Sequence, residues 1–493
     1  MECAVQKQVG SYYTPGEVVE SLVRWAVRSP DDRLLDPSCG DGRFLAAHSN
    51  SVGVEHQATA ARLAHRQAPT SPIHEGDFFA WAAATHERFS CAAGNPPFIR
   101  YQRFGGEVRR RAIRLCAAHG AKFTALASSW APFIVAASTL LRPGGRMAFV
   151  VPAEIGHAPY ARPVLQHLAA NFDWVQVIAI RRKLFPELSE DCWLLYCSGF
   201  GGRADELAFS TIDRFRFAET PPQADLLVPL NDWRGWGCRL RPFLLPAETR
   251  SSYRAWAEAP DCPHLKHVAR VGIGYVTGAN DFFHLRPSEA ERSRIPGSLL
   301  HPAVRSGRYL VGSAITDSTV EGWRRQDEPM LLLRLKRSDH LSQAVKNYLD
   351  SAQGKTARET YKCRNRRPWY VVPDVRVPDA FLSYMIGTSP ALVANRARCV
   401  ATNSVHVVRL NGSMSLAELQ ARWHQPLTAL SCEVEGHPLG GGMLKLEPRE
   451  AGNVLLAPRV ARARKEEARI GEGIEIMRTW RHYGQDAARL PLD

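Results

Sequence analysis

The chain has 493 residues, 45% of them hydrophobic and 23% charged, a balance typical of a globular protein with two large domains. No apolar run approaches the roughly 18 residues of a membrane span, and no secretory core or Cys-x-x-Cys pair occurs, so we expect a cytoplasmic protein without a structural metal. The formal net charge is +14, of which residues 1–200 carry only +4, so we expect a polyanionic partner held mainly by the second half.

Short apolar runs alternate with helical stretches through the first 200 residues, a pattern typical of an α/β domain with a parallel sheet. A crossover helix is expected within residues 125–141, and strands are expected at 33–36, 51–55, 89–93, 146–152 and 193–197. Proline, arginine and tryptophan then become frequent, which indicates a linker over 203–240 before a mixed α/β domain. We therefore expect one domain over 1–220 and a second over 221–493.

A turn of small residues, Asp36-Pro37-Ser38-Cys39-Gly40-Asp41-Gly42, follows the first expected strand and permits close approach of a ligand to the backbone. Glu55 ends the next strand, where its carboxylate can accept hydrogen bonds from both hydroxyls of a ribose. Asp77 follows the third strand and can accept from an adenine amino group, while Phe78 packs on the ring. Because no Gly-Lys-Ser/Thr follows the turn, we expect a nucleoside ligand without phosphates. The place of Glu55 and Asp77 on successive strands favours such a ligand over a set of solvated turns.

The run Asn95-Pro96-Pro97-Phe98 follows the fourth apolar stretch, and its two prolines restrict the backbone. The Asn95 side-chain oxygen and the Pro96 carbonyl can both accept hydrogens from an aromatic amino group. Such acceptors stabilise the positive charge that develops when this weakly nucleophilic nitrogen attacks a sulfonium methyl. Phe98 can stack on a target base that has left its duplex. A proline-rich turn is a common structural device, but its place after Glu55 favours the catalytic interpretation.

Together these segments resemble the TaqI-like, gamma-class adenine-specific DNA methyltransferases of type II restriction–modification systems. Residues Tyr13-Thr14-Pro15 match the first cofactor element of that family, and Leu184-Phe185-Pro186 resembles a late segment whose phenylalanine helps to sandwich a flipped base. Residues 271–283 and 440–448 extend the resemblance, more weakly, into the second half. The resemblance implies a Rossmann-like class I methyltransferase domain followed by a mixed α/β DNA target recognition domain.

The implied reaction transfers a methyl group from S-adenosyl-L-methionine to the exocyclic amino group of adenine in double-stranded DNA by base flipping. The product cofactor is S-adenosyl-L-homocysteine, and no metal takes part. The methylation protects DNA from a separate restriction endonuclease, which is the implied functional partner. A chain that carries its own recognition domain can act as a monomer in a bacterial or archaeal cytoplasm.

Residue by residue, the expected cofactor-binding set is Tyr13, Thr14, Pro15, Asp36, Pro37, Ser38, Cys39, Gly40, Glu55, Asp77, Phe78 and Asn95. The expected catalytic residues are Asn95, Pro96, Pro97 and Phe98, and the expected target-base stacking residues are Phe98 and Phe185. The segment after Phe185, residues 187–191, is unusually acidic for a surface near DNA.

The densest basic run lies in the second half, with aromatic residues Trp369 and Tyr370 directly after it. We expect its cations to contact DNA rather than only solvent, and they are Lys355, Arg358, Lys362, Arg364, Arg366 and Arg367. A second basic group follows Phe98 and comprises Arg109, Arg110, Arg111 and Arg114. It is either a guide for the DNA strand or one basic face of a helix.

The same tetrad occurs in methylases of RNA and of protein glutamine side chains, which are the alternative function. Those enzymes usually lack a long C-terminal domain and the Thr14-Pro15 element. Methylation of the cytosine amino group is also open, although serine is more usual there at the position of Asn95. A non-catalytic DNA-binding subunit is disfavoured because the acidic residues and the tetrad are intact.

Overall fold

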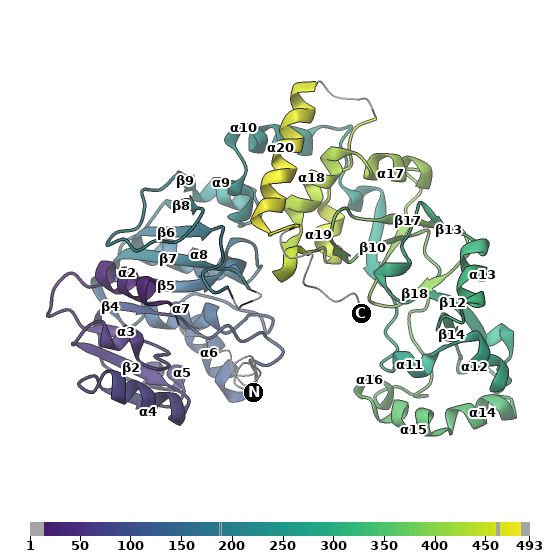
Figure 1. Ribbon diagram of the computed structural model, residues 1–493, viewed down its shortest axis with the longest axis horizontal. Coiled ribbons are helices and arrows are strands. Elements are labelled where there is room, and N and C mark those ends of the chain that lie inside the picture. Colours follow the sequence, from purple (N-terminus) through teal and green to yellow (C-terminus); the bar gives the residue numbers. More distant parts are fainter. Residues whose placement is uncertain (1–13, 187, 189, 460–463, 485–493) are drawn as a thin grey trace. The chain divides into compact units, whose positions relative to one another are not determined.

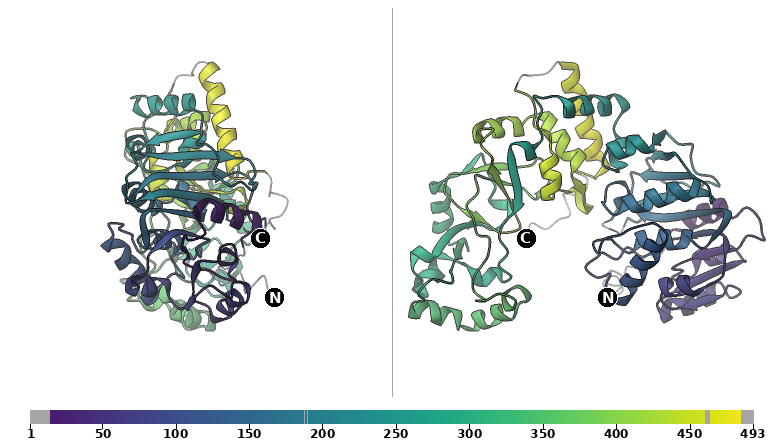
Figure 2. Two further views of the ribbon diagram at one scale, coloured as in Figure 1. Left: turned by 90° about the vertical axis from the view of Figure 1, so that its left-hand side faces the viewer. Right: turned by 180° about the vertical axis from the view of Figure 1, so that it is seen from behind.

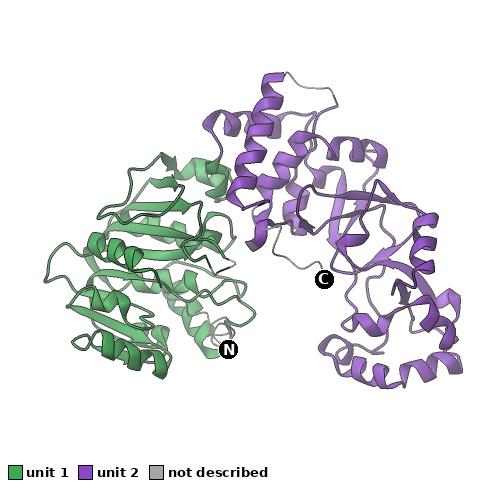
Figure 3. Cartoon of the chain, viewed as in Figure 1, with its two compact units in different colours: residues 1–244 green, residues 245–493 purple. Residues whose placement is uncertain are grey.

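The computed structural model describes residues 14–186, 188, 190–459 and 464–484. The chain divides into two compact units, 1–244 and 245–493, which Figure 3 shows in green and purple. This division falls after Leu244, later than the boundary near residue 220 that we expected. None of the described helices is long and apolar enough to cross a membrane.

A nine-stranded sheet is the framework of the first unit, with the strand order β3-β2-β1-β4-β5-β7-β6-β8-β9 (Figure 1). Its strands are β1 (Leu34–Asp36), β2 (Ser51–Glu55), β3 (Ile73–Glu75), β4 (Phe89–Gly94), β5 (Leu141–Pro152), β6 (Phe172–Ile180), β7 (Cys192–Phe200), β8 (Glu206–Ile212) and β9 (Leu226–Pro229). Strands β1 to β5 pair with one another in parallel, whereas β7 is antiparallel to both β5 and β6. The five strands expected from the sequence correspond to β1, β2, β4, β5 and β7.

Helices cover both faces of this sheet. They are α2 (Gly16–Ala26), α3 (Arg43–Ala46), α4 (Ala58–Gln67), α5 (Phe78–Ala84), α6 (Gly106–Ala118), α7 (Trp130–Ser138), α8 (Ala161–Asn171) and α9 (Leu230–Gly235). The apolar residues of α2 recur at helical spacing and are buried in one cluster with Ala148 and Val150 of β5. Because side chains alternate along a strand, the equally buried Phe149 and Val151 face the other side, where α7 packs against β5.

Residues 203–240 are not the linker that we expected. Strand β8 pairs in parallel with β6, and β9 pairs antiparallel with β8, so this segment extends the first sheet. Leu207, Ala208 and Phe209 of β8 are all buried. The error arose because short strands such as β8 and β9 have a weak periodic signal, and their assignment depends on the neighbours with which they pair.

The second unit is mixed α/β, as expected. Its described strands form three sheets with the orders β10-β19-β15-β17-β13, β11-β14-β12-β18 and β16-β21-β20. The strands are β10 (Ala269–Ile273), β11 (His284–Leu285), β12 (Leu300–Val304), β13 (Ala314–Ile315), β14 (Leu331–Leu333), β15 (Ala380–Leu382), β16 (Met385–Ile386), β17 (Leu392–Asn395), β18 (Val400–Ala401), β19 (His406–Leu410), β20 (His437–Pro438) and β21 (Leu444–Lys445).

The helices of the second unit lie around these sheets. They are α10 (Ala247–Glu258), α11 (Asn280–Phe283), α12 (Pro287–Arg292), α13 (Asp317–Arg325), α14 (Gln343–Leu349), α15 (Ala352–Glu359), α16 (Tyr361–Arg364), α17 (Leu416–Trp423), α18 (Pro426–Glu435), α19 (Pro448–Asn453) and α20 (Arg464–Trp480). Helices α14, α15 and α16 follow one another along one end of the unit, as the right-hand view of Figure 2 shows.

Candidate active site

A pocket of about 350 Å³ lies at the carboxyl ends of β1, β2 and β4 in the first unit. The strand order reverses between β1 and β4, and ligands of open α/β sheets bind in the crevice at such a point. Five loop segments supply most of the lining, and they are residues 36–41, 54–57, 76–78, 95–99 and 103–105. The pocket therefore collects the three acidic residues and the tetrad that the sequence analysis singled out.

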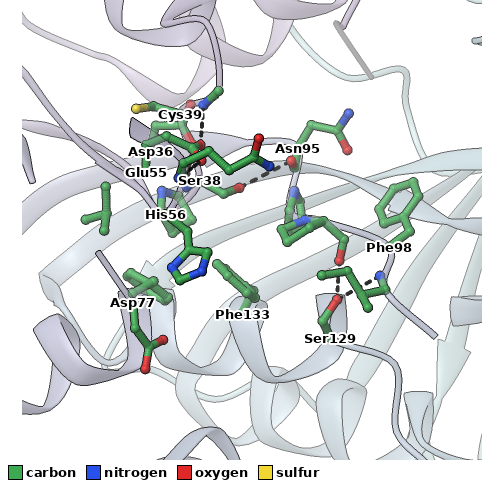
Figure 4. Close-up of a pocket in the computed structure, with 18 of the residues that line it drawn as sticks. Asp36, Ser38, Cys39, Glu55, His56, Asp77, Asn95, Phe98, Ser129 and Phe133 are labelled. Carbon is green, nitrogen blue, oxygen red and sulfur yellow. Dashed lines mark hydrogen bonds between the residues drawn. The ribbon is translucent and has the colours of Figure 1, made fainter. Parts of the chain in front are cut away.

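Glu55 closes the small-residue turn against the end of β2 (Figure 4). Its Oε2 accepts a hydrogen bond of 2.9 Å from the Gly40 backbone N–H, and its Oε1 accepts one of 2.7 Å from Gln57. The side chain is only 8% exposed. An ionised carboxylate has further lone pairs beyond the two engaged here, so Glu55 can hold the turn and still accept from a ligand hydroxyl.

Glycines permit the close approach of the loops in this pocket. A Cβ on Gly94 would lie 2.7 Å from Asp36 Oδ1, so a side chain at the end of β4 would displace the Asp36 carboxylate. Gly42 has a φ of 90°, and a Cβ there would lie 2.8 Å from the Ala64 backbone. Both positions therefore favour glycine for reasons of space, and Gly42 does so for its backbone conformation as well.

Asp36 is a buried carboxyl with one unused oxygen. Its Oδ1 accepts from the Ser38 N–H at 3.1 Å, whereas Oδ2 has no hydrogen-bond partner among the described residues. Burial raises the pKa of Asp36 to about 8, with the nearby Glu55 and Asp41 charges acting in the same direction and the Ser38 hydrogen bond opposing them. A buried acceptor without a partner is costly, and such atoms mark places where a ligand supplies the missing donor.

Asp77 caps helix α5. Its Oδ1 accepts from the Phe79 N–H at 3.1 Å, and its Oδ2 lies 3.4 Å from a guanidinium nitrogen of Arg111 on α6. Phe78 is buried and stacks on Phe133 of α7, with ring centroids 5.1 Å apart and an interplanar angle of 16°. Of the second basic group, Arg111 thus has a place beside the pocket, while Arg110 pairs with Glu107 on its own helix.

Asn95 follows β4 and is oriented by Thr14. The Asn95 Nδ2 donates to the Thr14 Oγ1 at 3.2 Å, and the backbone carbonyl of Asn95 accepts from the Ser38 Oγ at 3.3 Å. The side-chain oxygen Oδ1 is buried and finds no partner within the described part of the chain. Two unsatisfied acceptors, Asp36 Oδ2 and Asn95 Oδ1, therefore belong to residues that line the same pocket.

Most of the expected site residues in this unit line the pocket. They are Thr14, Asp36, Pro37, Ser38, Cys39, Gly40, Glu55, Asp77, Phe78, Asn95, Pro96, Pro97 and Phe98. Pro15 instead lies at the start of α2, outside the lining, and Tyr13 lies outside the described residues. His56, Ser129 and Phe133 also line the pocket, although no sequence motif indicated them. Their sequence positions do not indicate a role in the pocket, because a serine or phenylalanine next to an apolar helix resembles an ordinary core residue.

Phe185 is not brought to the pocket in this structure. It is 7% exposed and belongs to an apolar cluster with residues of α2 and the sheet, against which Phe98 also packs. Leu188 of the same segment does line the pocket. The acidic segment contacts the loop after the tetrad, because Glu190 accepts a hydrogen bond of 2.8 Å from Arg100.

The basic run of the second unit occupies α15, α16 and the residues after them. Five of its cations are exposed, namely Lys355, Arg358, Lys362, Arg364 and Arg367. Arg366 has a different environment, since its half-buried guanidinium donates to the backbone carbonyls of Val276 and Thr277 at 2.5 and 2.6 Å. Trp369 packs against Phe282 and Phe283 rather than facing solvent as an aromatic platform. Arg366 and Trp369 therefore hold the run in place.

The fold and the pocket define a class of protein. A parallel sheet with the antiparallel strand β7 inserted between β5 and β6 carries acidic residues at the ends of β1 and β2 and an Asn-Pro-Pro-Phe tetrad after β4. This is the arrangement of a class I S-adenosylmethionine-dependent methyltransferase, with a large second unit attached.

Comparisons with known proteins cover both units. Residues 3–185 match the family of N-6 DNA methylases, and residues 239–481 match the C-terminal domain of the Type II methyltransferase M.Eco57I. The Type II methyltransferase M.XamI of Xanthomonas campestris pv. amaranthicola is 24% identical over 471 residues, which span 90% of this chain and 84% of that protein. The tRNA1(Val) (adenine(37)-N6)-methyltransferase of Actinobacillus succinogenes is 32% identical, but over only 27% of this chain and 59% of its own length.

Among solved structures, a nuclease-deletion mutant of the Type ISP restriction-modification enzyme LlaGI, in complex with a DNA substrate mimic, has a similar fold. Its TM-score is 0.52 at 12% identity, and the match covers 94% of this chain and 46% of that one. The chain belongs to the N-6 adenine DNA methylase family and is a DNA methyltransferase with Type II methyltransferases among its homologues. This confirms the adenine DNA methyltransferase family that the sequence motifs indicated, while the gamma-class subtype stays a prediction.

Proposed function

We propose that this enzyme is a site-specific adenine methyltransferase that modifies double-stranded DNA and protects it from a separate restriction endonuclease. The observation that carries the proposal is the Asn95 amide, whose nitrogen is held by Thr14 and whose oxygen is a buried acceptor without a partner in the described chain. An exocyclic amino group supplies the donor that this oxygen lacks. The second unit and its exposed basic run supply the surface for DNA.

The residues of the pocket fit S-adenosylmethionine, which supplies a methyl group on a positively charged sulfonium. Asp36 and Glu55 offer carboxylate oxygens for the hydrogen-bond donors of the cofactor. Phe78 and Phe133 form the apolar wall beside Asp77 against which an adenine ring can pack. The pocket therefore has a charged end and an aromatic end, as an amphipathic nucleoside requires.

Catalysis by this chain rests on position and on preorganised acceptors. Asn95 Oδ1 and the Pro96 carbonyl accept hydrogen bonds from the amino group and draw its hydrogens out of the plane of the base. The nitrogen therefore becomes more tetrahedral, and its developing positive charge is stabilised. Phe98 is half-buried at the pocket and offers a face to the base. A base within a duplex cannot reach these atoms, so the target adenine must leave its stack.

The direct test labels DNA with tritiated S-adenosylmethionine, using mixed-sequence duplex from a host that lacks adenine methylation. Digestion to nucleosides then identifies the labelled base, and sequencing of the product identifies the recognition site. We expect the label in N6-methyladenosine. Label in methylcytosine would contradict adenine as the target base. Label confined to RNA or to protein glutamine would contradict DNA as the substrate.

We expect binding of the cofactor to release a proton from Asp36. Burial raises the pKa of this carboxyl to about 8, so it is largely protonated at neutral pH in the ligand-free enzyme. A cationic ligand favours the carboxylate, so the affinity for S-adenosylmethionine should rise between about pH 6 and pH 8. Calorimetric titration in two buffers of different ionisation enthalpy measures the proton release. Equal heats in both buffers would contradict this assignment, and Asp36→Asn should abolish the pH dependence.

The same carboxyl has a consequence for folding. The folded protein holds this proton more tightly than the unfolded chain, in which the pKa is 3.8. The stability that it contributes is complete below that value and is lost as the pH rises through about 8. A thermal melting series without ligand should therefore show a smaller fall in stability with pH for Asp36→Asn than for the wild type.

The exposed cations of the basic run should set the salt dependence of DNA binding. We expect the double variant Lys362→Ala/Arg364→Ala to bind duplex DNA more weakly and to reduce the slope of log Kd against log salt by about 0.9 for each phosphate that is no longer neutralised. Fluorescence anisotropy over a salt series measures both quantities. Arg325→Ala on α13 is the control, because it removes an equally exposed cation outside the run. An unchanged slope in the double variant would place the DNA elsewhere.

A further inference from the structure

Within the tetrad loop, no backbone hydrogen bond joins residues 95–99 to one another, and the internal bonds lie later, where the Arg103 and Phe104 N–H groups donate to the Arg100 carbonyl. Pro96 and Pro97 have no N–H to donate, and residues 95–105 between β4 and α6 form turns and irregular backbone without a helix or strand. Methyl transfer nevertheless requires the Asn95 and Pro96 oxygens to be fixed relative to the cofactor. The rigidity of this loop must therefore come from contacts with other elements.

Ser129 alone makes three hydrogen bonds to the tetrad loop. Its Oγ donates to the Pro97 carbonyl and accepts a hydrogen bond of 2.9 Å from the Ile99 N–H, as Figure 4 shows. Its backbone N–H donates to the Ile99 carbonyl at 3.0 Å. The residue is 0% exposed. Ser129 thus engages the loop on both sides of Phe98 and does so without competition from bulk water.

The support beneath Ser129 is rigid. The residue lies directly before α7, whose residues are buried except for Phe133 and which packs against the central strand β5. A side chain mounted at the start of a buried helix has little freedom, so it transmits the position of the helix to the loop. Phe133 on the same helix forms the aromatic wall of the pocket, so α7 carries both a wall of the cofactor site and the anchor of the tetrad.

We propose that Ser129 is a positioning residue that holds the tetrad loop in its reactive geometry and links it to the aromatic wall on α7. This inference rests on the proposed methyl transfer to an amino group. In this proposal Ser129 fixes the backbone of residues 97–99, while Thr14 orients the Asn95 side chain at the other end of the loop. Without the hydroxyl, the Pro97 carbonyl and the Ile99 N–H lose their shared partner, and the loop gains alternative positions.

The neighbouring Ser128 offers a matched control. It is also buried, at 5% exposed, and its Oγ lies 3.0 Å from the Tyr160 hydroxyl. Within the described residues its hydroxyl has no hydrogen bond to the tetrad loop. Ser128→Ala therefore removes the same atom from the adjacent position and leaves the loop anchored.

The experiment compares Ser129→Ala, Ser129→Cys and Ser128→Ala with the wild type in methylation of mixed-sequence duplex DNA. We expect kcat to fall roughly 10- to 100-fold in Ser129→Ala, with the KM and Kd for S-adenosylmethionine within about threefold of wild type. Ser129→Cys fills the same space with a weakly hydrogen-bonding thiol, so it should lower kcat even if the alanine variant packs poorly. Ser128→Ala should retain wild-type kcat. Equal losses in Ser128→Ala and both Ser129 variants, or an unchanged kcat in Ser129→Cys, would overturn the proposal.

A second measurement tests the role of Ser129 in holding the loop without relying on enzyme activity. Hydrogen exchange followed by mass spectrometry should show faster exchange in the peptide that contains Ile99 for both Ser129 variants but not for Ser128→Ala. If the wild type methylates no DNA, the proposed function fails, whereas the exchange comparison still decides whether Ser129 holds the loop. Unchanged exchange in both Ser129 variants would show that it does not.

Discussion

Asn95→Ala should reduce methylation of DNA by on the order of 10²- to 10³-fold, the size of effect seen when a preorganised electrostatic donor or acceptor is removed. The loss should fall on kcat, because the Asn95 oxygen stabilises charge that develops only as the methyl group moves. The affinity for S-adenosylmethionine should change little. Steady-state kinetics with labelled cofactor, together with calorimetric titration, measures both quantities.

Asn50→Ala is the control for this variant. Asn50 is an exposed asparagine of the same unit whose amide donates to the Asp31 carbonyl, away from the pocket lining. It should keep wild-type activity. If Asn95→Ala retained more than about a tenth of wild-type kcat, which corresponds to less than ~1.4 kcal/mol, the acceptor role proposed for its side chain would be wrong.

Glu55→Ala has the second large expected effect, and it should fall on cofactor binding. The carboxylate holds Gly40 and Gln57 and is placed for the ribose hydroxyls, and hydrogen bonds to a charged group contribute about 1.5–3 kcal/mol each. We therefore expect the Kd for S-adenosylmethionine to rise roughly 10- to 150-fold. Calorimetric titration measures this Kd, and activity should recover at saturating cofactor.

Glu75→Ala provides the comparison, because Glu75 is the residue on β3 that pairs with Glu55 in the sheet register yet is exposed and outside the pocket lining. Its Kd should equal that of the wild type. A rise of similar size in both variants would indicate a general effect of removing charge from this sheet edge. In that case the specific ribose contact assigned to Glu55 would be contradicted.

The chemistry of the site was accessible from the sequence because its residues lie in short, local motifs. Asp36 and Glu55 end apolar strands and Asn95 directly follows one, and the carboxyl ends of parallel strands meet at one edge of a sheet. The order of the strands was not needed to predict that these residues lie close together. The same reasoning failed for residues 203–240, because strands such as β8 and the edge strand β9 are recognised by their partners more than by their own composition.

Long-range contacts explain what was missed or misjudged. Ser129 lies 30 residues beyond the Ile99 N–H that it binds, and nothing in its local sequence distinguishes it from Ser128. Arg366 looks like its basic neighbours, yet its guanidinium lies on two carbonyls of a segment about 90 residues away. Phe185 matches a family segment, but burial against α2 decides where its ring lies here.

The sequence alone indicated the family, the fold class and most of the predicted site residues that the structure brings to one pocket, since strand-end motifs and periodicity are local properties of the chain. The tertiary structure decided which polar atoms of these residues have a hydrogen-bond partner within the described chain and which have none. Asp36 and Asn95 each have one side-chain atom with a hydrogen-bond partner and one without a partner among the described residues, and only the folded structure reveals this difference. Hydrogen-bond satisfaction depends on atoms brought together from distant segments, so it exists only in the folded chain.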